Sequence, residues 1–515
     1  MGWLYSLLSL SSEFQGMIFF NLNTFLLTAL VIIFYLIIRR YSKSTLTNKI
    51  LLLSGNFAII NLIAKPKEIV FLILISTGVY FLGKKIQQTK NKALMIGGIS
   101  ILIIGFILKN YQILELKIIQ RIGMSYILFR LIHFLLESKR DTLKSSDVLT
   151  FINYILYFPN FLAGPIDDYN NFHYWLNRGK STYGNMLIKA GIVRLLIGVI
   201  KKYLLVPLIV NFALTFAHMP EDISWQLSVI ISVIFYSFYI IFDFSGYSDI
   251  AIGTAYLMGI KTPENFDNPY SAPNLSSFWK KWHMTFSNFL FKNVFIPFAS
   301  FMTKISGSKR RLWVTFLAYF FTFTICGMWH GNKMNFIYWG LWHGLGLVLY
   351  KVFDIYVIKQ KTAGIIRRYL GVAVTFCFVS VGWFFFNYST NDIHSVVSNF
   401  TNSNPHRASI SMVKQENKKG ILIELENTLS PLNGTFTLED NQGNFIYFDR
   451  KEIEPMKTFL LIPKAKYQGL VQVNIIDADG TTSTILDYFN TKIPDQSDLS
   501  KNLFWEYPQI SEFKK

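Results

Sequence analysis

The chain has 515 residues, of which 51% are hydrophobic, 17% aromatic and 16% charged, and its formal net charge is +19. A mean hydropathy of +0.33 is too high for a soluble globular protein of this length. The composition therefore excludes an ordinary soluble enzyme and predicts an all-α polytopic membrane protein.

Apolar runs that are long enough, or nearly long enough, to cross a bilayer recur along the first 390 residues. In chain order they cover residues 17–38, 50–64, 69–82, 93–108, 122–136, 188–213, 225–242, 286–302, 312–329, 335–352 and 369–386. Several are shorter than the roughly 20 residues that a perpendicular helix needs, so we predict about eleven transmembrane helices, some of them tilted or buried. The first run is too long for a signal peptide and lacks a small-residue cleavage site.

The basic residues predict the orientation of the chain. Four cations lie between residues 39 and 49 and four between residues 84 and 92, whereas Lys65 and Lys67 are the only cations in the loop between them. The positive-inside rule places the two richer loops in the cytoplasm and the N-terminus outside. Five more cations between residues 351 and 368 precede the last run, so the chain beyond residue 386 is also predicted to lie outside.

The positive charge belongs to the membrane part of the chain. Residues 401–515 carry 13 Lys and Arg against 15 Asp and Glu, which leaves the whole excess to residues 1–400. Basic loops between apolar runs are typical of contact with anionic membrane lipids, so we expect lipids and no nucleic acid as partners.

The C-terminal part has a different pattern. Short alternating runs cover residues 420–425, 434–438, 458–462 and 470–476, and turn signals such as Asn433-Gly434 and Asp479-Gly480 separate them. We therefore predict a transmembrane domain over residues 1–390 and a small all-β, sandwich-like extracytoplasmic domain over residues 401–515. Because this second domain has no nucleophile or metal motif, a docking or folding module is favoured over a second catalytic domain.

The sequence contains no phosphate-binding loop, dinucleotide fingerprint, HExxH motif or cluster of cysteine ligands. Reactions driven directly by ATP or by a redox cofactor are therefore not expected. We predict no metal site and no tightly bound cofactor.

Histidines at the ends of apolar runs are the strongest chemical signal. His330 ends the run over residues 312–329 in the context Trp329-His330-Gly331, and His283 follows Trp282. A group that titrates near neutral pH seldom lies at membrane depth without a function, because its charged form is costly to bury. His343, in Trp342-His343-Gly344, is equally well explained by helix packing.

Two carboxylates form the second signal. Asp243 and Asp249 flank Phe244-Ser245-Gly246-Tyr247-Ser248 and need hydrogen bonds or a wet cavity at this depth. A helix break held by polar side chains is favoured here over direct catalysis. Three prolines between residues 263 and 273 then forbid a continuous helix and lead the chain to His283.

These segments together resemble the membrane-bound O-acyltransferase (MBOAT) family over roughly residues 17–390. The resemblance rests on the order and spacing of Phe161–Ile166, Asp243–Asp249, Pro263–Phe266, Phe278–His283 and Gly327–Gly331. Residues 17–21 and 382–386 look like the alginate O-acetylases, whereas residues 125–130, 164–167 and 259–266 look like the D-alanyl transfer proteins of teichoic acids. Both branches remain open.

The resemblance implies roles for single residues. His330 corresponds to the catalytic histidine of the family and His283 to the second functional histidine of its bacterial members. The sequence departs from the family at Lys292-Asn293-Val294, where many relatives carry Arg-Asp-Tyr. We also expect a set of residues to contribute to substrate binding, namely Asp243, Asp249, Asn274, Trp282 and Trp329.

The expected reaction is acyl transfer from a cytoplasmic thioester, either an acyl-coenzyme A or a phosphopantetheine carrier protein, to hydroxyls of an envelope or exported polysaccharide. A neutral His330 would act as general base, while His283 would bind or polarise the donor or acceptor. Acetyl is the first choice of acyl group, and D-alanyl transfer to teichoic acid is the alternative. We expect the bacterial cytoplasmic membrane as location and a secreted acyltransferase as a possible partner.

Two other classes of protein stay open at this point. A transporter or flippase also carries intramembrane His and Asp, but more often shows inverted repeats, and no convincing internal repeat is found. A catalytically silent scaffold that presents the β-rich tail is the third class. Substitution of His330 separates these classes from an acyltransferase.

Overall fold

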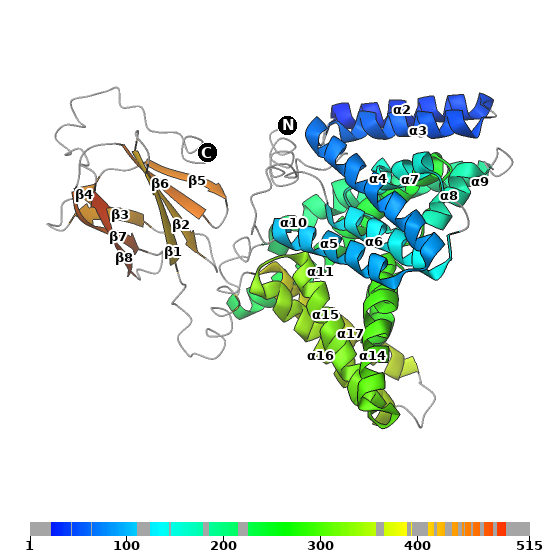
Figure 1. Cartoon of the computed structure of the whole chain (residues 1–515). Coiled ribbons are helices and arrows are strands. Elements are labelled where there is room, and N and C mark those ends of the chain that lie inside the picture. The colour runs from blue at the N-terminus through cyan, green and yellow to red at the C-terminus, as the bar shows by residue number, and fades with distance from the viewer. Residues whose placement is uncertain are drawn as a thin grey trace. The chain divides into compact units, whose positions relative to one another are not determined.

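The computed structural model describes residues 22–42, 44–62, 64–110, 124–143, 146–178, 185–214, 225–356, 365–388 and 393, and the strand residues between 410 and 490 given below. Its first helices are α2 (Leu22–Tyr41), α3 (Thr45–Ile60), α4 (Pro66–Thr89), α5 (Lys92–Asn110), α6 (Met124–Arg140), α7 (Val148–Ile155) and α8 (Tyr169–Asn177). Figure 1 shows α2 and α3 side by side. The core of this part contains a tight aromatic group, in which the rings of Phe134 and Phe151 are 4.3 Å apart.

The later helices carry the residues of interest. They are α9 (Asn185–Ile200), the π-helix η4 (Lys201–Leu205), α10 (Val206–Leu214), α11 (Trp225–Leu257), α12 (Leu275–Lys281), α13 (Met284–Leu290), the π-helix η7 (Phe291–Phe295), α14 (Ile296–Ser306), α15 (Arg311–His330), α16 (Met334–Tyr356) and α17 (Ile365–Asn387). Helix α15 packs against both α14 and α16 (Figure 1).

Polar side chains fix where several helices begin. Ser44, Asp147, Asp168 and Asn274 each accept a hydrogen bond from the backbone N–H three residues further on, at 3.3, 2.8, 2.7 and 2.8 Å. Such caps satisfy amide groups that have no partner inside the helix. They start α3, α7, α8 and α12.

Most predicted apolar runs correspond to helices, but one expectation needs correction. The predicted break at Asp243–Asp249 is wrong, because α11 continues through these residues to Leu257. The runs over residues 188–213 and 286–302 are each helical and contain a π-helix, Lys201–Leu205 and Phe291–Phe295. The absence of a continuous helix over residues 263–273 is confirmed, since this stretch contains a single short 3₁₀ turn, Pro269–Ser271.

Among the described residues, four segments are long and apolar enough to cross a membrane: Pro66–Thr89, Val229–Leu257, Arg311–His330 and Ile366–Asn387. Shorter apolar helices in the described part of the chain are Leu27–Arg39, Thr45–Ile60 and Lys92–Leu108. The helical membrane class is therefore supported, while the number of about eleven spans stays a prediction. Residues 17–21 of the first predicted run lie outside the described residues.

Glycines bring α9 and α11 into close contact. A Cβ on Gly198 would lie 2.7 Å from the carbonyl oxygen of Gly246, and a Cβ on Gly253 would lie 2.7 Å from the backbone nitrogen of Leu195. Real Cβ atoms do not approach backbone this closely, so the two backbones pack where side chains are absent. This contact places the polar residues of α11 next to the cations of α9 and η4.

The described strands of the C-terminal part pair into two four-stranded antiparallel sheets. One sheet has the order β1 (Ile410–Glu416), β2 (Gly420–Asn427), β6 (Lys457–Pro463) and β5 (Asp449–Glu454), and the other β4 (Phe445–Ile446), β3 (Thr435–Asp440), β7 (Gln468–Ile476) and β8 (Thr482–Asn490). The boundary predicted between residues 390 and 401 lies outside the described residues. The separate extracytoplasmic domain stays a prediction.

Candidate active site

His283 lies at a junction that two backbone hydrogen bonds hold in place. Met284 N–H donates to the carbonyl of Asn265 at 2.8 Å, and Asp267 N–H donates to the carbonyl of Lys281 at 3.0 Å. The extended segment around Asn265 therefore runs beside the turn between α12 and α13. His283 itself has a left-handed backbone, with φ of 42° and ψ of 54°. This conformation is unfavourable for a residue with a Cβ and is often found at functional sites.

His283 is 3% exposed, and its ring has a partner at each nitrogen. Its Nδ1 lies 2.9 Å from Asn265 Oδ1, and its Nε2 lies 3.4 Å from the hydroxyl of Tyr126 on α6. Phe244 on α11 contacts the ring edge-on at 4.8 Å, and Phe286 lies 5.0 Å away. The neighbouring helix α13 and three segments more distant in the sequence thus enclose this imidazole.

His330 is the last residue of α15 and is half-buried. Edge-on aromatic contacts surround it, from Trp339 at 5.0 Å and from Phe386 at 4.9 Å, and Trp329 lies 4.5 Å away. A Cβ at Gly340 would collide with the backbone of Phe323, so this glycine permits α16 to approach α15 closely. The loop after His330 is short, because α16 begins at Met334.

The structure brings the two predicted histidines together. Phe286 contacts both the ring of His283 and, at 4.5 Å, the ring of Trp329 beside His330. Burial, together with the neighbouring His330, lowers the pKa of His283 to about 3. His283 is therefore neutral at physiological pH, and its ring serves as a hydrogen-bonding group and not as a cation.

Of the predicted substrate-binding residues Trp329, Trp282 and Asn274, one has a hydrogen-bond donor that is unpaired among the described residues, and the other two are engaged in packing or helix capping. Trp329 lies in the histidine cluster, and its indole N–H is buried with no hydrogen-bond partner in the part of the chain that the structure describes. Trp282 is buried and packs on Phe278 and Trp383. Asn274 caps α12 through its side chain. Trp329 is therefore the best placed of the three to offer a free donor.

The two predicted carboxylates lie in ion pairs. Asp249 is 2.5 Å from Arg194 Nε and 2.7 Å from Lys201 Nζ, and Asp243 pairs with the buried Lys202. Arg194 also pairs with Glu264. These contacts satisfy charges at membrane depth, and they explain how α11 carries two carboxylates without a break. Their predicted role in substrate binding remains a prediction.

His343 lies deeper in the same aromatic region. It is fully buried on α16 and sits 5.0 Å from Trp279 and 5.1 Å from Trp339. Neither ring nitrogen has a hydrogen-bond partner among the described residues. A Cβ at Gly382 would lie 2.7 Å from its Nε2, so that glycine leaves room for the ring.

A polar cavity of about 510 Å³ is lined in part by Thr285, which contacts the Asn265 side chain that holds His283. Ile166 and Thr285 form part of its wall, and Thr285 donates a hydrogen bond to Asn265 Oδ1 at 2.9 Å. The other lining residues are His133, Asp167, Asp168, Asn171, Trp175, Lys261, Thr262, Pro263, Asn288, Phe289, Lys292 and Asn293. The positions Lys292 and Asn293, where the sequence departs from the family, therefore face this cavity. Asn293 also accepts a hydrogen bond from Arg140 at 2.8 Å.

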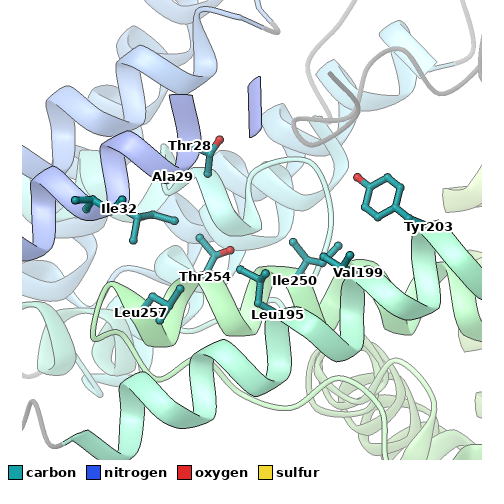
Figure 2. Close-up of a pocket in the computed structure, with 10 residues that line it drawn as sticks. Thr28, Ala29, Ile32, Leu195, Val199, Tyr203, Ile250, Thr254 and Leu257 are labelled. Carbon is teal, nitrogen blue, oxygen red and sulfur yellow. The ribbon is translucent and has the colours of Figure 1, made fainter. Parts of the chain in front are cut away.

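A second cavity, of about 180 Å³, is apolar (Figure 2). The side chains of Ile32, Leu195, Ile250 and Leu257 point into it from three helices, and Thr254 lies beside them. Its lining lacks the chemical groups of the histidine cluster, so it offers space for an apolar chain and no catalytic group.

Sequence reasoning missed Asn265, Thr285 and Tyr126. Asn265 and Tyr126 belong to segments that carry the family resemblance, yet neither had received a role, because their contacts to His283 span 18 and 157 residues. Among the described residues, no group of three or more His, Cys, Asp or Glu side chains is placed to hold a metal ion.

Comparison with known proteins identifies similar chains. Residues 14–390 match the model of the membrane-bound O-acyltransferase family. The chain is 32% identical over 283 residues to the teichoic acid D-alanyltransferase of Bacillus subtilis, with 53% of this chain and 69% of that relative covered.

Two acetyltransferases are also similar. The chain is 30% identical over 282 residues to the peptidoglycan O-acetyltransferase of Helicobacter pylori, which covers 54% of this chain and 50% of the relative. It is 28% identical over 276 residues to a probable alginate O-acetylase of Pseudomonas syringae, with 52% and 48% covered. The chain thus matches about half the length of these two relatives.

Proposed function

The chain belongs to the membrane-bound O-acyltransferase family and is an acyl-transfer enzyme, and we propose that it moves an acyl group from a thioester to hydroxyls of a cell-envelope polymer. One observation carries the proposal. His283 and His330 come from separate elements, yet a continuous row of contacting rings joins them: Phe286 packs on His283, and Trp329 packs on both Phe286 and His330. Family membership also makes a transporter or a silent scaffold the weaker alternatives.

In the proposed reaction His330 is the general base. Its neutral imidazole takes the proton of the acceptor hydroxyl while that oxygen bonds to the thioester carbonyl carbon. The carbon–sulfur bond then breaks, and the departing thiolate receives the proton back from His330 to become a thiol, which regenerates the neutral imidazole. The buried indole N–H of Trp329 supports this step as a donor for the carbonyl oxygen, where negative charge develops. No tightly bound cofactor takes part in the proposal.

The polar cavity supports entry of the donor from the cytoplasm. Lys49 pairs with Asp147 at 3.1 Å and Lys90 pairs with Asp141 at 2.5 Å, so both loops predicted to be cytoplasmic meet the segment after α6. Asn170 donates to Thr142 in the same segment at 3.0 Å, and its neighbour Asn171 lines the cavity. A donor that entered here, an acyl-coenzyme A or a phosphopantetheine carrier protein, would reach the wall beside His283.

Charge placement also supports access of the acceptor from outside. Lys309, Arg310 and Arg311 lie at the opposite end of α15 from His330. By the positive-inside rule this end faces the cytoplasm, so His330 lies toward the outer side. We place the enzyme in the bacterial cytoplasmic membrane, with its N-terminus and β-rich part outside. A secreted acyltransferase is a candidate partner there.

The acyl group has two candidates. Acetyl is the choice that the sequence favoured, and relatives named for acetylation of peptidoglycan and alginate match about half of this chain. D-alanyl is the second, because the relative named for D-alanylation of teichoic acid is 32% identical and covered over 69% of its length. The acceptor in either case is an envelope polysaccharide or a teichoic acid.

Mass spectrometry of envelope polymers tests the proposal. Cells would express the wild type, His330→Ala, the control His173→Ala on α8 or an empty vector, with membrane levels of each protein matched. We expect one polymer to gain the mass of an acetyl or alanyl group with the wild type and the control, and not with His330→Ala or the vector. An unchanged increment with His330→Ala would overturn the catalytic assignment.

A further inference from the structure

Two neighbours, Thr285 and Ser248, fix the orientation of the Asn265 amide. Thr285 Oγ1 accepts a hydrogen bond from the backbone N–H of Ile166 at 3.0 Å and donates its own proton to Asn265 Oδ1 at 2.9 Å. On its other side Asn265 Nδ2 donates to Ser248 Oγ at 3.1 Å. The amide oxygen therefore points at Thr285 and His283, and the amide nitrogen points away from them.

This amide determines which nitrogen of His283 carries the proton. The amide oxygen accepts hydrogen bonds and cannot donate them, so the Nδ1 atom 2.9 Å away must carry a hydrogen. The opposite tautomer would set two acceptors against each other at this distance. In the neutral ring Nε2 is then unprotonated and accepts from the hydroxyl of Tyr126.

We propose that Asn265 is a positioning residue that holds His283 as the Nδ1–H tautomer, so that Nε2 accepts a hydrogen bond from a hydroxyl of the acyl acceptor. The inference rests on the proposed acyl transfer and deepens it. His283 presents no N–H to the acyl carbonyl in this state. Its contribution is to bind the incoming alcohol.

The contact to Tyr126 indicates how an acceptor is accommodated. At 3.4 Å it is longer than the usual range of about 2.7–3.2 Å, so it is weak and a closer hydroxyl would replace it. The attacking hydroxyl has one proton, which goes to His330 in the proposed reaction. The hydroxyl bound at His283 is therefore a neighbouring one on the same acceptor, as sugars and polyols provide.

The tautomer is measurable without any substrate. The full-length protein, labelled with ¹⁵N-histidine and purified in detergent, would be compared with His283→Gln to assign the His283 signals. We expect a protonated Nδ1 and an unprotonated Nε2 in the wild type and in Tyr126→Phe. A protonated Nε2 in the wild type would overturn the proposal.

Two substitutions at Asn265 separate positioning from mere packing. Asn265→Ala removes the oxygen, so we expect the two tautomers of His283 to mix. Asn265→Asp keeps an oxygen acceptor and should restore the Nδ1–H form, and its carboxylate should raise the pH at which the ring takes a second proton. The titratable groups that face the ring are Tyr126 and His330, and both are kept in these variants. An unchanged tautomer in Asn265→Ala would overturn the role of Asn265.

The polymer assay completes the test. Asn265→Ala should reduce acylation of the polymer, and Asn265→Asp should retain more of it at neutral pH. Full acylation with Asn265→Ala, at matched expression, would overturn the functional half of the proposal. Acylation that persists in His330→Ala would instead reject the proposed catalytic role of His330, while the tautomer result would stand independently.

Discussion

Lys201 Nζ lies 2.7 Å from Asp249 Oδ2, and this ion pair joins η4 to the C-terminal half of α11. Arg194 approaches the other oxygen of the same carboxylate at 2.5 Å. The Asp249 side chain is 6% exposed, whereas the cations are 31% and 28% exposed. Asp249, which the sequence suggests as a substrate-binding residue, thus also links α11 to α9 and η4 through its ion pairs.

The first prediction concerns this ion-pair cluster. Asp249→Asn should lower stability by about 1–3 kcal/mol, because loss of one partner leaves cations beside a desolvated amide, although their partial exposure softens the cost. Thermal unfolding of the purified protein in detergent measures the effect. Asp354→Asn, which breaks the more exposed pair with Lys351 at 3.3 Å, is the control and should cost less than about 1 kcal/mol. A raised KM at unchanged Tm would instead support substrate binding by Asp249.

The second prediction concerns the contact between α9 and α11. Gly198→Ala should destabilise the protein by about 1–3 kcal/mol, because the added methyl meets backbone atoms that cannot move aside. Gly97→Ala on α5 is the matched control, since a Cβ there has nothing within 4 Å. The control should be neutral or stabilising by about 0.5–1 kcal/mol. Equal Tm shifts for both variants would contradict the close-packing argument.

The third prediction concerns pH and the start of α7. Burial opposes the charged form of Asp147, but hydrogen bonds from Thr150 and Lys49 outweigh it and lower the pKa of this carboxyl. A lowered pKa stabilises the folded state above the ordinary value of about 3.9, and the gain disappears as pH falls through the lowered pKa. Asp147→Asn keeps a capping oxygen without the charge. Its Tm deficit should therefore be present at pH 7 and shrink in acid, and a deficit that grew in acid would contradict this account.

The fourth prediction concerns the pH dependence of the reaction. Because the pKa of His283 is lowered to about 3, the ring is neutral above that pH and gains a proton only below it. Any loss of activity between about pH 5 and 8 should therefore come from another group. The rate of acyl transfer would be followed across this range for the wild type and His283→Gln. We expect the variant to react more slowly, while the pH at which the rate falls on the acid side stays the same as in the wild type. A shift of that pH in the variant would show that His283 is the group that titrates there.

The fifth prediction concerns the indole of Trp329. Trp329→Phe keeps an aromatic ring against Phe286 and removes the buried N–H, so kcat should fall by about 10²-fold if that group stabilises the carbonyl oxygen. Trp313→Phe, at the exposed start of α15, is the control and should retain the wild-type rate. A change confined to Tm would show that Trp329 contributes packing and no donor.

Local patterns in the sequence were sufficient to predict the helices, the irregular stretch before His283 and the family. Apolar runs predicted the helices, since hydropathy depends on neighbouring residues, and proline predicted the irregular stretch before His283. The order of short motifs predicted the family, which the match over residues 14–390 confirms. The Trp-His contexts singled out His283 and His330 before their proximity was known.

Tertiary structure decided how the same residues are used. Asp243 and Asp249 predicted a helix break when read alone, but cations from α9 and η4 neutralise them and the helix continues. Asn265 gained its role because the chain folds its segment back along the turn at His283. A hydrogen bond depends on position in space, and residues 18 or 157 apart in the sequence share no local pattern from which that position follows.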